Sequence, residues 1–485
     1  MKYLRNLLAI TLLLFVTASC EDFSLDLEVP NYEHPNDDIL TSNPVALTGT
    51  ASSILNNWFM TVHDYWGPGM AMQTMADVST CSWGNVGMKD LSSEPRAAYN
   101  NKSSYGYGNL TNTYFNALYS VLSDANTIVA AAEKDTPFDD PDLVKMMGKV
   151  GQALAVGHLA LVFDRVWLSD EQGVVGEDAA DYKVAMEFAL QKLDDAIAIA
   201  KSSGVDVPES WLPGGGGANA TFTAFLNSMG ARMLVGNVRN SAQKASIDWN
   251  KVLNYTNNGV AEDFTIFMDD VTWYDLAPKT YLVYPGWARV DMRVVHMMDP
   301  NTPDYWTDDM IVADSSISDD ARLATDYQYL SSNNFRPTRG KYHFSNQRYA
   351  RLDYYISEWV TDVVEYSASE NDMYKAEALL NTGDVAGAAA VVNAGTRTVR
   401  GLLPEVAADA TAVYDAIHYE RMVEFAYTGF GIGFFEMRKE DLLQKGTLLH
   451  FPIPGKALEA IPEDNYTYGG TMGVAGEDYS NGGWR

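Results

Sequence analysis

Residues 373–393 read MYKAEALLNTGDVAGAAAVVN. Ala378 lies five residues before Gly383, and Ala388 lies five residues after it. Small residues at equal distances from a turn allow two antiparallel helices to approach closely. Asp384 follows the glycine, where its carboxylate can accept hydrogen bonds from the first amides of the next helix. The stretch therefore predicts a tightly packed helix–turn–helix pair.

Other parts of the chain have the 3.6-residue apolar period of amphipathic helices. The pattern is clear in residues 114–133, and similar patterns occupy residues 150–167, 184–200 and 218–237. The spacing around Gly383 resembles the inner turn of a tetratricopeptide repeat. Together these stretches predict a mainly α fold, built as a tetratricopeptide-like helix-pair scaffold over about 46–260 and 350–430.

Two long stretches lack this period. Residues 64–107 and 262–349 are rich in Pro, Asp, Asn and aromatic side chains. Irregular stretches of this length in a compact protein are usually functional. We therefore predict a single domain over 46–485 with long irregular, aromatic-rich loop insertions. The insert at about 262–349 would form the ligand face, and residues 440–485 would form an irregular C-terminal segment.

The N-terminus reads MKYLRNLLAITLLLFVTASC. Lys2 and Arg5 precede an apolar run, and small residues precede Cys20, which is the layout of a secretory signal peptide. A cysteine at the cleavage position is typical of bacterial lipoproteins, although Thr17 stands where an aliphatic residue is usual. We predict a signal peptide over 1–19 and an acylated tether over 20–45, anchored through lipid at Cys20. The alternative is an ordinary signal peptide with an incidental cysteine.

Composition narrows the classes of function. The formal net charge of −30 argues against nucleic acid as a partner. The chain has two cysteines, Cys20 and Cys81. No metal-binding spacing of His and Cys and no nucleophile elbow is present, so we predict no metal, no cofactor and no catalytic residue. With many carboxylates in the chain, a glycosidase pair stays open as an alternative.

The order of these pieces, ending in IHYERMVEFAYTGFGIGFFEMRK and LLHFPIPGKAL, resembles the SusD/RagB family of outer-membrane nutrient-binding lipoproteins. The matching letters are an ER-x-x-E-F stretch, an aromatic-glycine turn, a motif ending in Arg, and P-I-P. In this chain they are Glu420-Arg421, Glu424-Phe425, Tyr427–Phe430, Met437-Arg438 and Pro452-Ile453-Pro454. Thr428-Gly429 replaces the usual Glu-Gly, and Glu436–Lys439 replaces Asp-Leu-Arg-Arg, which suggests a divergent subgroup.

The resemblance implies a surface protein that captures a glycan and passes it to a TonB-dependent transporter barrel in the outer membrane. Glu21 and Asp22 resemble the surface-export signal of such lipoproteins, or are simply a solvated tether. Two alternatives stay open: the same scaffold binding peptide or another nutrient, and a secreted lipoprotein polysaccharide hydrolase.

Sugar recognition needs flat apolar side chains for the C–H faces of the rings, with amides and carboxylates for the hydroxyls. Aromatic residues in the two irregular stretches are the candidates, each of which could instead be buried in the core. Trp83, Trp273 and Trp287 rank first, since family members often place their platform on these stretches. The others are Trp66, Tyr274, Tyr281, Tyr305 and Trp306, with Asn85 and Asp275 as polar partners.

Overall fold

The computed structural model describes most of the chain after the predicted tether. The predictions for the signal peptide, for Cys20 and for the tether up to residue 42 therefore lie outside the described residues. Those residues are 43–81, 84–134, 136–275, 284–305, 315–331, 345–425, 428–461, 463–470, 479–480 and 482–484. Pro44 and Val45, at the predicted end of the tether, already belong to helix α3 (Pro44–Val62).

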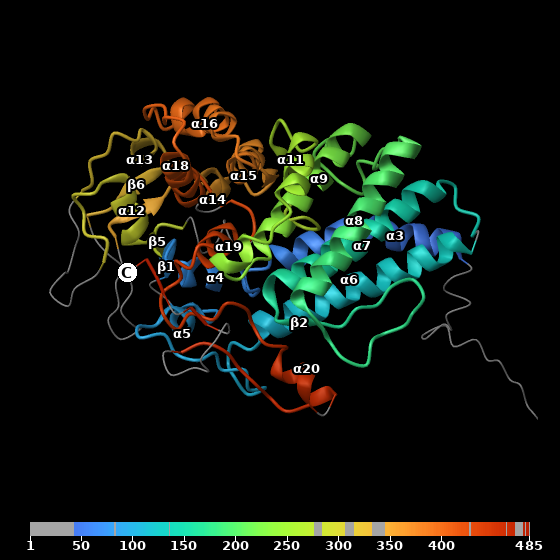
Figure 1. Ribbon diagram of the computed structural model, residues 1–485. Coiled ribbons are helices and arrows are strands. Elements are labelled where there is room, and N and C mark those ends of the chain that lie inside the picture. Colours follow the sequence, from blue (N-terminus) through green and yellow to red (C-terminus); the bar gives the residue numbers. More distant parts are fainter. Residues whose placement is uncertain are drawn as a thin grey trace, which may run out of the picture.

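A first layer of long helices forms one side of the molecule (Figure 1). It contains α3 (Pro44–Val62), α6 (Asn109–Glu133), α7 (Pro141–Val162) and α8 (Tyr182–Ser203). Helix α7 lies at its centre, packs against the other three, and is buried from Met146 to its end. This layer bears out the predicted helices over 114–133, 150–167 and 184–200, with ends that differ by up to nine residues.

Glycines in α7 allow this close packing. A Cβ atom on Gly157 would lie 2.2 Å from Met233 Sδ, and one on Gly151 would lie 2.8 Å from Ala125 Cβ. Both distances are too short for any real contact, so the neighbouring helices could not approach α7 this closely if larger residues stood there. The apolar layer is therefore set by small residues as much as by large ones.

The start of α7 differs from the periodic pattern, which predicted a helix over 150–167. Asp140 accepts a hydrogen bond from the Leu143 amide (3.0 Å), and Pro141 occupies the first helical position. Both are favoured at helix N-termini. The helix ends at Val162, and strand β2 follows at residues 165–166, within the predicted helix.

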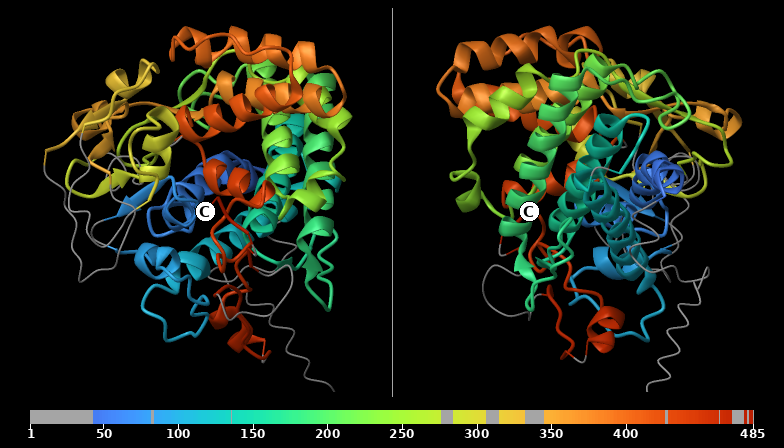
Figure 2. Two further views of the ribbon diagram at one scale, coloured as in Figure 1. Left: turned by 60° about the vertical axis from the view of Figure 1, so that its left-hand side comes forward. Right: turned by 90° about the vertical axis from the view of Figure 1, so that its right-hand side faces the viewer.

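A second helical layer contains the repeat-like pair (Figure 2). Helices α15 (Ala368–Asn381) and α16 (Val385–Ala394) pack together as predicted, and Asp384 accepts a hydrogen bond from Gly387 (2.8 Å). Gly383 turns the chain with a φ of +92°, where glycine has no steric cost. The layer is completed by α9 (Asn219–Gly236), α11 (Trp249–Asn257) and α18 (Ala410–Val423).

The predicted irregular insert contains more regular structure than its sequence suggested. The described part of the chain contains four antiparallel strand pairs. Two of them join the insert to segments far away in sequence, one lies within the insert, and one is a local pair between α7 and α8. The pairs are β1 (Ser79–Cys81) with β5 (Ala288–Val290), β2 (Arg165–Val166) with β3 (Ala180–Asp181), β4 (Phe264–Met268) with β8 (Thr361–Tyr366), and β6 (Tyr327–Tyr329) with β7 (Gln347–Tyr349).

Short helices connect these pieces. They are α4 (Gly69–Met75), α5 (Met88–Ser92), α10 (Ser241–Lys244), α12 (Met292–Met298), α13 (Arg322–Thr325), α14 (Tyr354–Ser357), α17 (Thr396–Val399), α19 (Ile432–Lys439) and α20 (Gly455–Ala460).

The charged residues of the ER-x-x-E-F stretch form a buried cluster where the second helical layer meets the insert. Glu420 of α18 and Glu424, the C-cap of that helix, contact Arg322 of α13 at 2.7 and 3.0 Å, and all three side chains are almost fully buried. Arg421 points elsewhere and pairs with Glu377 of α15 and Glu436 of α19, both at 2.7 Å. Alternating contacts of this kind tie α18 to three other helices.

Arg438 of α19 has a different role. Its guanidinium donates to the carbonyls of Leu161 (3.2 Å), Gly236 (2.7 Å) and Leu449 (2.7 Å). The first two carbonyls belong to the C-terminal turns of α7 and α9, where helix carbonyls have no partner within the helix. Arg438 therefore joins both helical layers to the C-terminal segment.

Candidate functional site

An open groove lies where α3 ends against the N-terminal half of α6. Its volume is about 620 Å³, and its walls come from three segments distant in sequence. The lining residues are Asn56, Asn57, Met60, Thr61, His63, Asp64, Tyr65, Trp66, Gly67, Thr113, Tyr114, Ala117, Ser120, Val121 and Tyr274.

Four aromatic side chains line this groove. Trp66 is 42% exposed and lies against Tyr65, with ring centroids 4.9 Å apart. Tyr274 reaches the groove from the loop after β4. Tyr114 of α6 is buried, and its hydroxyl has no hydrogen-bond partner among the described residues. The groove thus offers the exposed ring surface of Trp66, whereas the Tyr114 hydroxyl has almost no accessible surface.

A short turn presents the Tyr65–Trp66 pair. The Trp66 amide donates to the Asp64 carboxylate (2.9 Å), and the Gly67 amide donates to the Asp64 carbonyl (2.8 Å). An Asp side chain that bonds the amide two residues later fixes the backbone of a turn. Burial raises the pKa of Asp64 above its usual value.

The polar side chains of the groove are mostly uncharged. Asn56 donates to the Thr272 carbonyl (2.9 Å), which ties α3 to the loop that holds Tyr274. Asn57, Thr61 and Ser120 add amide and hydroxyl groups to the lining. These groups can exchange hydrogen bonds with hydroxyls of a ligand, while the ring surfaces contact its apolar faces.

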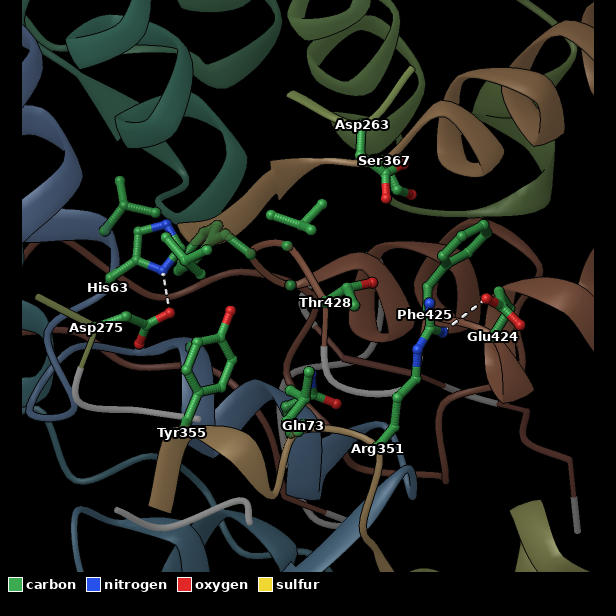
Figure 3. Close-up of a pocket in the computed structure, with 18 of the residues that line it drawn as sticks. His63, Gln73, Asp263, Asp275, Arg351, Tyr355, Ser367, Glu424, Phe425 and Thr428 are labelled. Carbon is green, nitrogen blue, oxygen red and sulfur yellow. Dashed lines mark hydrogen bonds and ion pairs between the residues drawn. The ribbon is translucent and has the colours of Figure 1, made fainter. Parts of the chain in front are cut away.

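A buried ion-pair network stands behind the groove. His63, the C-cap of α3, contacts Asp275 through Nδ1 (3.0 Å) and Glu365 of β8 through Nε2 (2.6 Å); Figure 3 draws the first contact. Burial alone would lower the pKa of His63, but the two carboxylates outweigh it and raise the pKa to about 10. The imidazolium therefore stays charged at neutral pH and holds the Asp275 loop against α3.

The network continues into the second layer. Arg232 of α9 pairs with Glu365 (3.2 Å) and Glu370 (2.8 Å), and all three side chains are buried. The floor of the groove is therefore fixed by charged contacts between α3, α9, β8 and α15. A rigid floor of this kind lowers the entropic cost of binding.

Comparison with known proteins was made on sequence and on structure. No family model matches the sequence, and no curated protein matches it. Solved structures do match the fold over most of the chain. A SusD superfamily protein from Bacteroides vulgatus superposes with a TM-score of 0.58 at 14% identity, covering 87% of this chain and 98% of that chain.

Two further structures agree with it. Surface glycan-binding protein A from Bacteroides uniformis has a TM-score of 0.57 at 13% identity, covering 87% of this chain and 98% of that one. A SusD-like carbohydrate binding protein from B. vulgatus has a TM-score of 0.55 at 14% identity, covering 84% of each chain. The chain has the SusD-like fold. The predicted resemblance is thereby confirmed at the level of the fold.

The SusD-like fold places two of the predicted site residues in the groove, Trp66 and Tyr274. Trp273 does not fit the prediction that it contacts ligand. Its side chain is only 6% exposed and packs against Phe59 of α3, with ring centroids 5.5 Å apart. The large apolar indole is more stable in the core than at the surface, so adjacent aromatics take opposite roles.

Asp275 also differs from its predicted role as a polar partner for ligand. It is buried and paired with His63, so it supports the groove from behind. Asn85 is half-buried in the loop before α5 and lies outside the groove lining. Neither residue belongs to the polar set that faces the open groove.

The remaining candidates divide into two groups. Trp287 is half-buried and pairs with Tyr284 just before β5, at a centroid distance of 6.2 Å, and Tyr305 is 38% exposed beyond α12. Neither lines the groove. Trp83, Tyr281 and Trp306 lie outside the described residues.

The sequence reasoning missed Asn56, Asn57, Tyr65 and Tyr114. Asn56, Asn57 and Tyr114 lie on helices, where a periodic pattern alone does not distinguish them from other helical residues. Tyr65 had a usable signal, because it stands in DYWGPG directly after α3. Two aromatics in a Gly/Pro turn at a helix end predict an exposed pair.

No helix in the part of the chain that the structure describes is long and apolar enough to span a bilayer. In the same part of the chain, no group of three or more His, Cys, Asp or Glu side chains is arranged to hold a metal ion.

Proposed function

We propose that this protein is a cell-surface lipoprotein, not an enzyme, that binds a neutral glycan in the groove between α3 and α6. The observation that supports this most directly is the groove itself, in which the exposed Trp66 and the half-buried Tyr65 and Tyr274 stand beside uncharged amides and hydroxyls. The SusD-like fold adds support, because two of the similar structures are a surface glycan-binding protein and a carbohydrate binding protein.

The negative charge of the protein favours binding of neutral glycans over acidic ones. The chain has a formal net charge of −30, and a polyanionic ligand would approach against that field. Within the groove lining, Asp64 is the acidic side chain and His63 is already paired with two carboxylates. We therefore expect neutral oligosaccharides to bind more tightly than uronic-acid polymers.

The proposal includes delivery of the glycan to a TonB-dependent transporter barrel, with the protein held at the outer membrane by lipid on Cys20. This part rests on the sequence resemblance. Cys20→Ala is expected to release the protein from the envelope fraction while glycan affinity stays the same. Co-purification of the wild-type protein with a transporter from membranes would support the hand-off, and isolation of the protein without any barrel would oppose it.

Affinity electrophoresis against neutral glycans, acidic glycans and peptides tests the binding step. Trp66→Ala is expected to weaken neutral glycan binding at least ten-fold, since truncating a central aromatic anchor costs about 2 kcal/mol or more and each 1.4 kcal/mol is ten-fold in affinity. Trp359→Ala is the matched control, because Trp359 is 51% exposed but lies outside the groove. Peptide binding in place of glycan binding, or release of reducing ends, would favour one of the two alternative functions.

A further inference from the structure

The loop after β4 places Tyr274 in the wall of the groove. The neighbours of this tyrosine in the chain are turned inward, since Trp273 is 6% exposed and Asp275 is 2% exposed. Tyr274 between them is half-buried and contributes to the groove lining. The position of its ring therefore depends on how the backbone of residues 269–275 is held.

One face of α3 holds this loop from behind. Three side chains of the helix, spaced three and four residues apart, contact the loop, and this spacing places them on the same face. They are Asn56, Phe59 and His63. In that order they contact Thr272, Trp273 and Asp275. Figure 3 shows the Asp275 carboxylate turned toward the His63 ring. The backbone on both sides of Tyr274 is thereby tied to α3.

The carboxylate of Asp269 organises the same loop from within. Its Oδ1 atom accepts hydrogen bonds from the amides of Val271 (2.9 Å), Thr272 (2.7 Å) and Trp273 (2.8 Å). In the opposite direction, the amides of Asp269 and Asp270 donate to the Trp273 carbonyl (3.1 and 3.2 Å). An Asp side chain that accepts hydrogen bonds from backbone amides a few residues later fixes the backbone of a turn. One side chain thus closes the turn that leads into the groove wall.

The backbone does not adopt this turn without support. Asp270 has a φ of +61°, in the left-handed region that is unfavourable for most residues other than glycine. The Trp273 amide, with the two amides before it, lowers the pKa of Asp269 below its ordinary value, so the side chain is ionised at neutral pH. Hydrogen bonds to an ionised acceptor are stronger than those to a neutral one. Loss of this acceptor would therefore release the turn and, with it, the fixed position of Tyr274.

We propose that Asp269 is a positioning residue of the groove and holds Tyr274 in place for contact with a bound glycan. Asp269 is not part of the groove lining, so its effect on affinity passes through Tyr274. A wall that is ordered before the ligand arrives lowers the entropic cost of binding. The inference rests on the proposed glycan binding, and it adds that a carboxylate outside the groove sets part of the affinity.

Affinity electrophoresis of the mature protein against soluble starch, inulin and galactomannan tests this role, with melting temperatures recorded to confirm folding. Asp269→Ala should weaken binding about three- to ten-fold, the usual cost of ordering one side chain and its loop on binding. Asp269→Glu, which displaces the carboxylate by one methylene, should weaken it similarly and provides a second variant. Asp269→Asn keeps an acceptor at the same place and should retain most of the wild-type affinity.

A double-mutant cycle shows whether the effect passes through Tyr274. Tyr274→Ala by itself should weaken binding at least as much as Asp269→Ala does. In the Tyr274→Ala background, Asp269→Ala should cause no further loss, because both changes remove the same contact with the ligand.

Asp409→Ala is the matched control. Asp409 also accepts hydrogen bonds from the amides two and three residues later, those of Thr411 (3.1 Å) and Ala412 (3.0 Å), and it lies outside the groove lining. Glycan affinity should be unchanged in this variant. Hydrogen exchange without glycan is a second measurement. The amides of residues 271–273 should exchange faster in Asp269→Ala than in the wild type and in Asp269→Asn.

Any of four results would overturn the inference. They are unchanged affinity in Asp269→Ala, an equal loss in Asp269→Asn, a further loss in the Tyr274→Ala background, and unchanged exchange at residues 271–273 in Asp269→Ala. Each of these results leaves the proposed function intact, since the wild type still binds glycan. Absence of binding to every neutral glycan by the wild type would instead refute the proposed function, and the inference with it.

Discussion

The layer of α3 and α6–α8 and the block around α18 and α19 are both buried, but different forces hold them. In the first, glycines and apolar side chains allow helices to touch, as at Gly157 and Gly151. In the second, ion pairs cross between helices, as at Arg322 with Glu420 and Arg421 with Glu436. The groove lies on the first layer, and the network around His63 joins it to the second.

This difference explains why the residues of the most recognisable motif, ER-x-x-E-F, are not the proposed binding residues. In the ER-x-x-E-F stretch, Glu420, Arg421 and Glu424 are buried and paired. A buried charge that loses its partner strongly destabilises the fold, so each of these residues depends on the oppositely charged residue it contacts. The groove has no such requirement, and its residues can change with the ligand.

Breaking the charged block is expected to have the largest effect on stability. Arg322→Met would leave Asp320 and Glu420 buried without their cation, whereas Glu424 would keep Arg351 and Arg400. We expect a loss of about 3–5 kcal/mol in the free energy of unfolding, measured by urea denaturation. Lys145→Met is the control, because its pair with Glu133 is exposed (3.7 Å) and should change stability by about 1 kcal/mol or less. A loss below 1 kcal/mol for Arg322→Met would contradict the structural role of the block.

The His63 network predicts a pH dependence at the join of the two regions. The pKa of His63 is about 10 in the folded protein, against an ordinary value of about 6.5. The folded state therefore holds a proton more tightly, and its stabilisation is complete below pH 6.5 and lost as the pH rises through 10.

Urea denaturation between pH 6 and pH 10 measures this effect. The difference between wild type and His63→Gln should shrink with rising pH, by at most about 1.4 kcal/mol per pH unit. A difference that stays constant across this window would show that His63 is not charged in the folded protein.

Enlarging a glycine tests the apolar layer. Gly157→Ala places a Cβ atom within 2.2 Å of Met233 Sδ and should cost about 1–3 kcal/mol through overpacking. Gly49→Ala is the matched control, because Gly49 lies in α3 with no atom within 4 Å of the added Cβ. That change should stabilise the protein by about 0.4–1 kcal/mol. Equal melting temperatures for the two variants would mean that α7 does not depend on close contact.

The groove should show the smallest effect on folding. Trp66→Ala is expected to change the free energy of unfolding by about 1 kcal/mol or less, because the side chain is 42% exposed. Trp58→Ala, in the buried face of α3, should cost about 3–5 kcal/mol by the same measurement. A large loss for Trp66→Ala would make it a structural residue and weaken its assignment to binding.

The sequence by itself determined the helical scaffold. The apolar period and the Gly383 turn are local properties of the sequence. They predicted the positions of α6, α8, α9 and the α15–α16 pair to within a few residues. The Asp384 cap was also readable, because capping involves only the next few residues. The resemblance in the ER-x-x-E-F block pointed to the SusD-like fold, and in this chain its charged residues form buried ion pairs.

Only the tertiary structure decided which aromatic side chains face a ligand. Trp273 and Tyr274 are neighbours in sequence, yet the first is in the core and the second lines the groove. Exposure depends on which distant segment packs against a side chain, here Phe59 of α3 against Trp273.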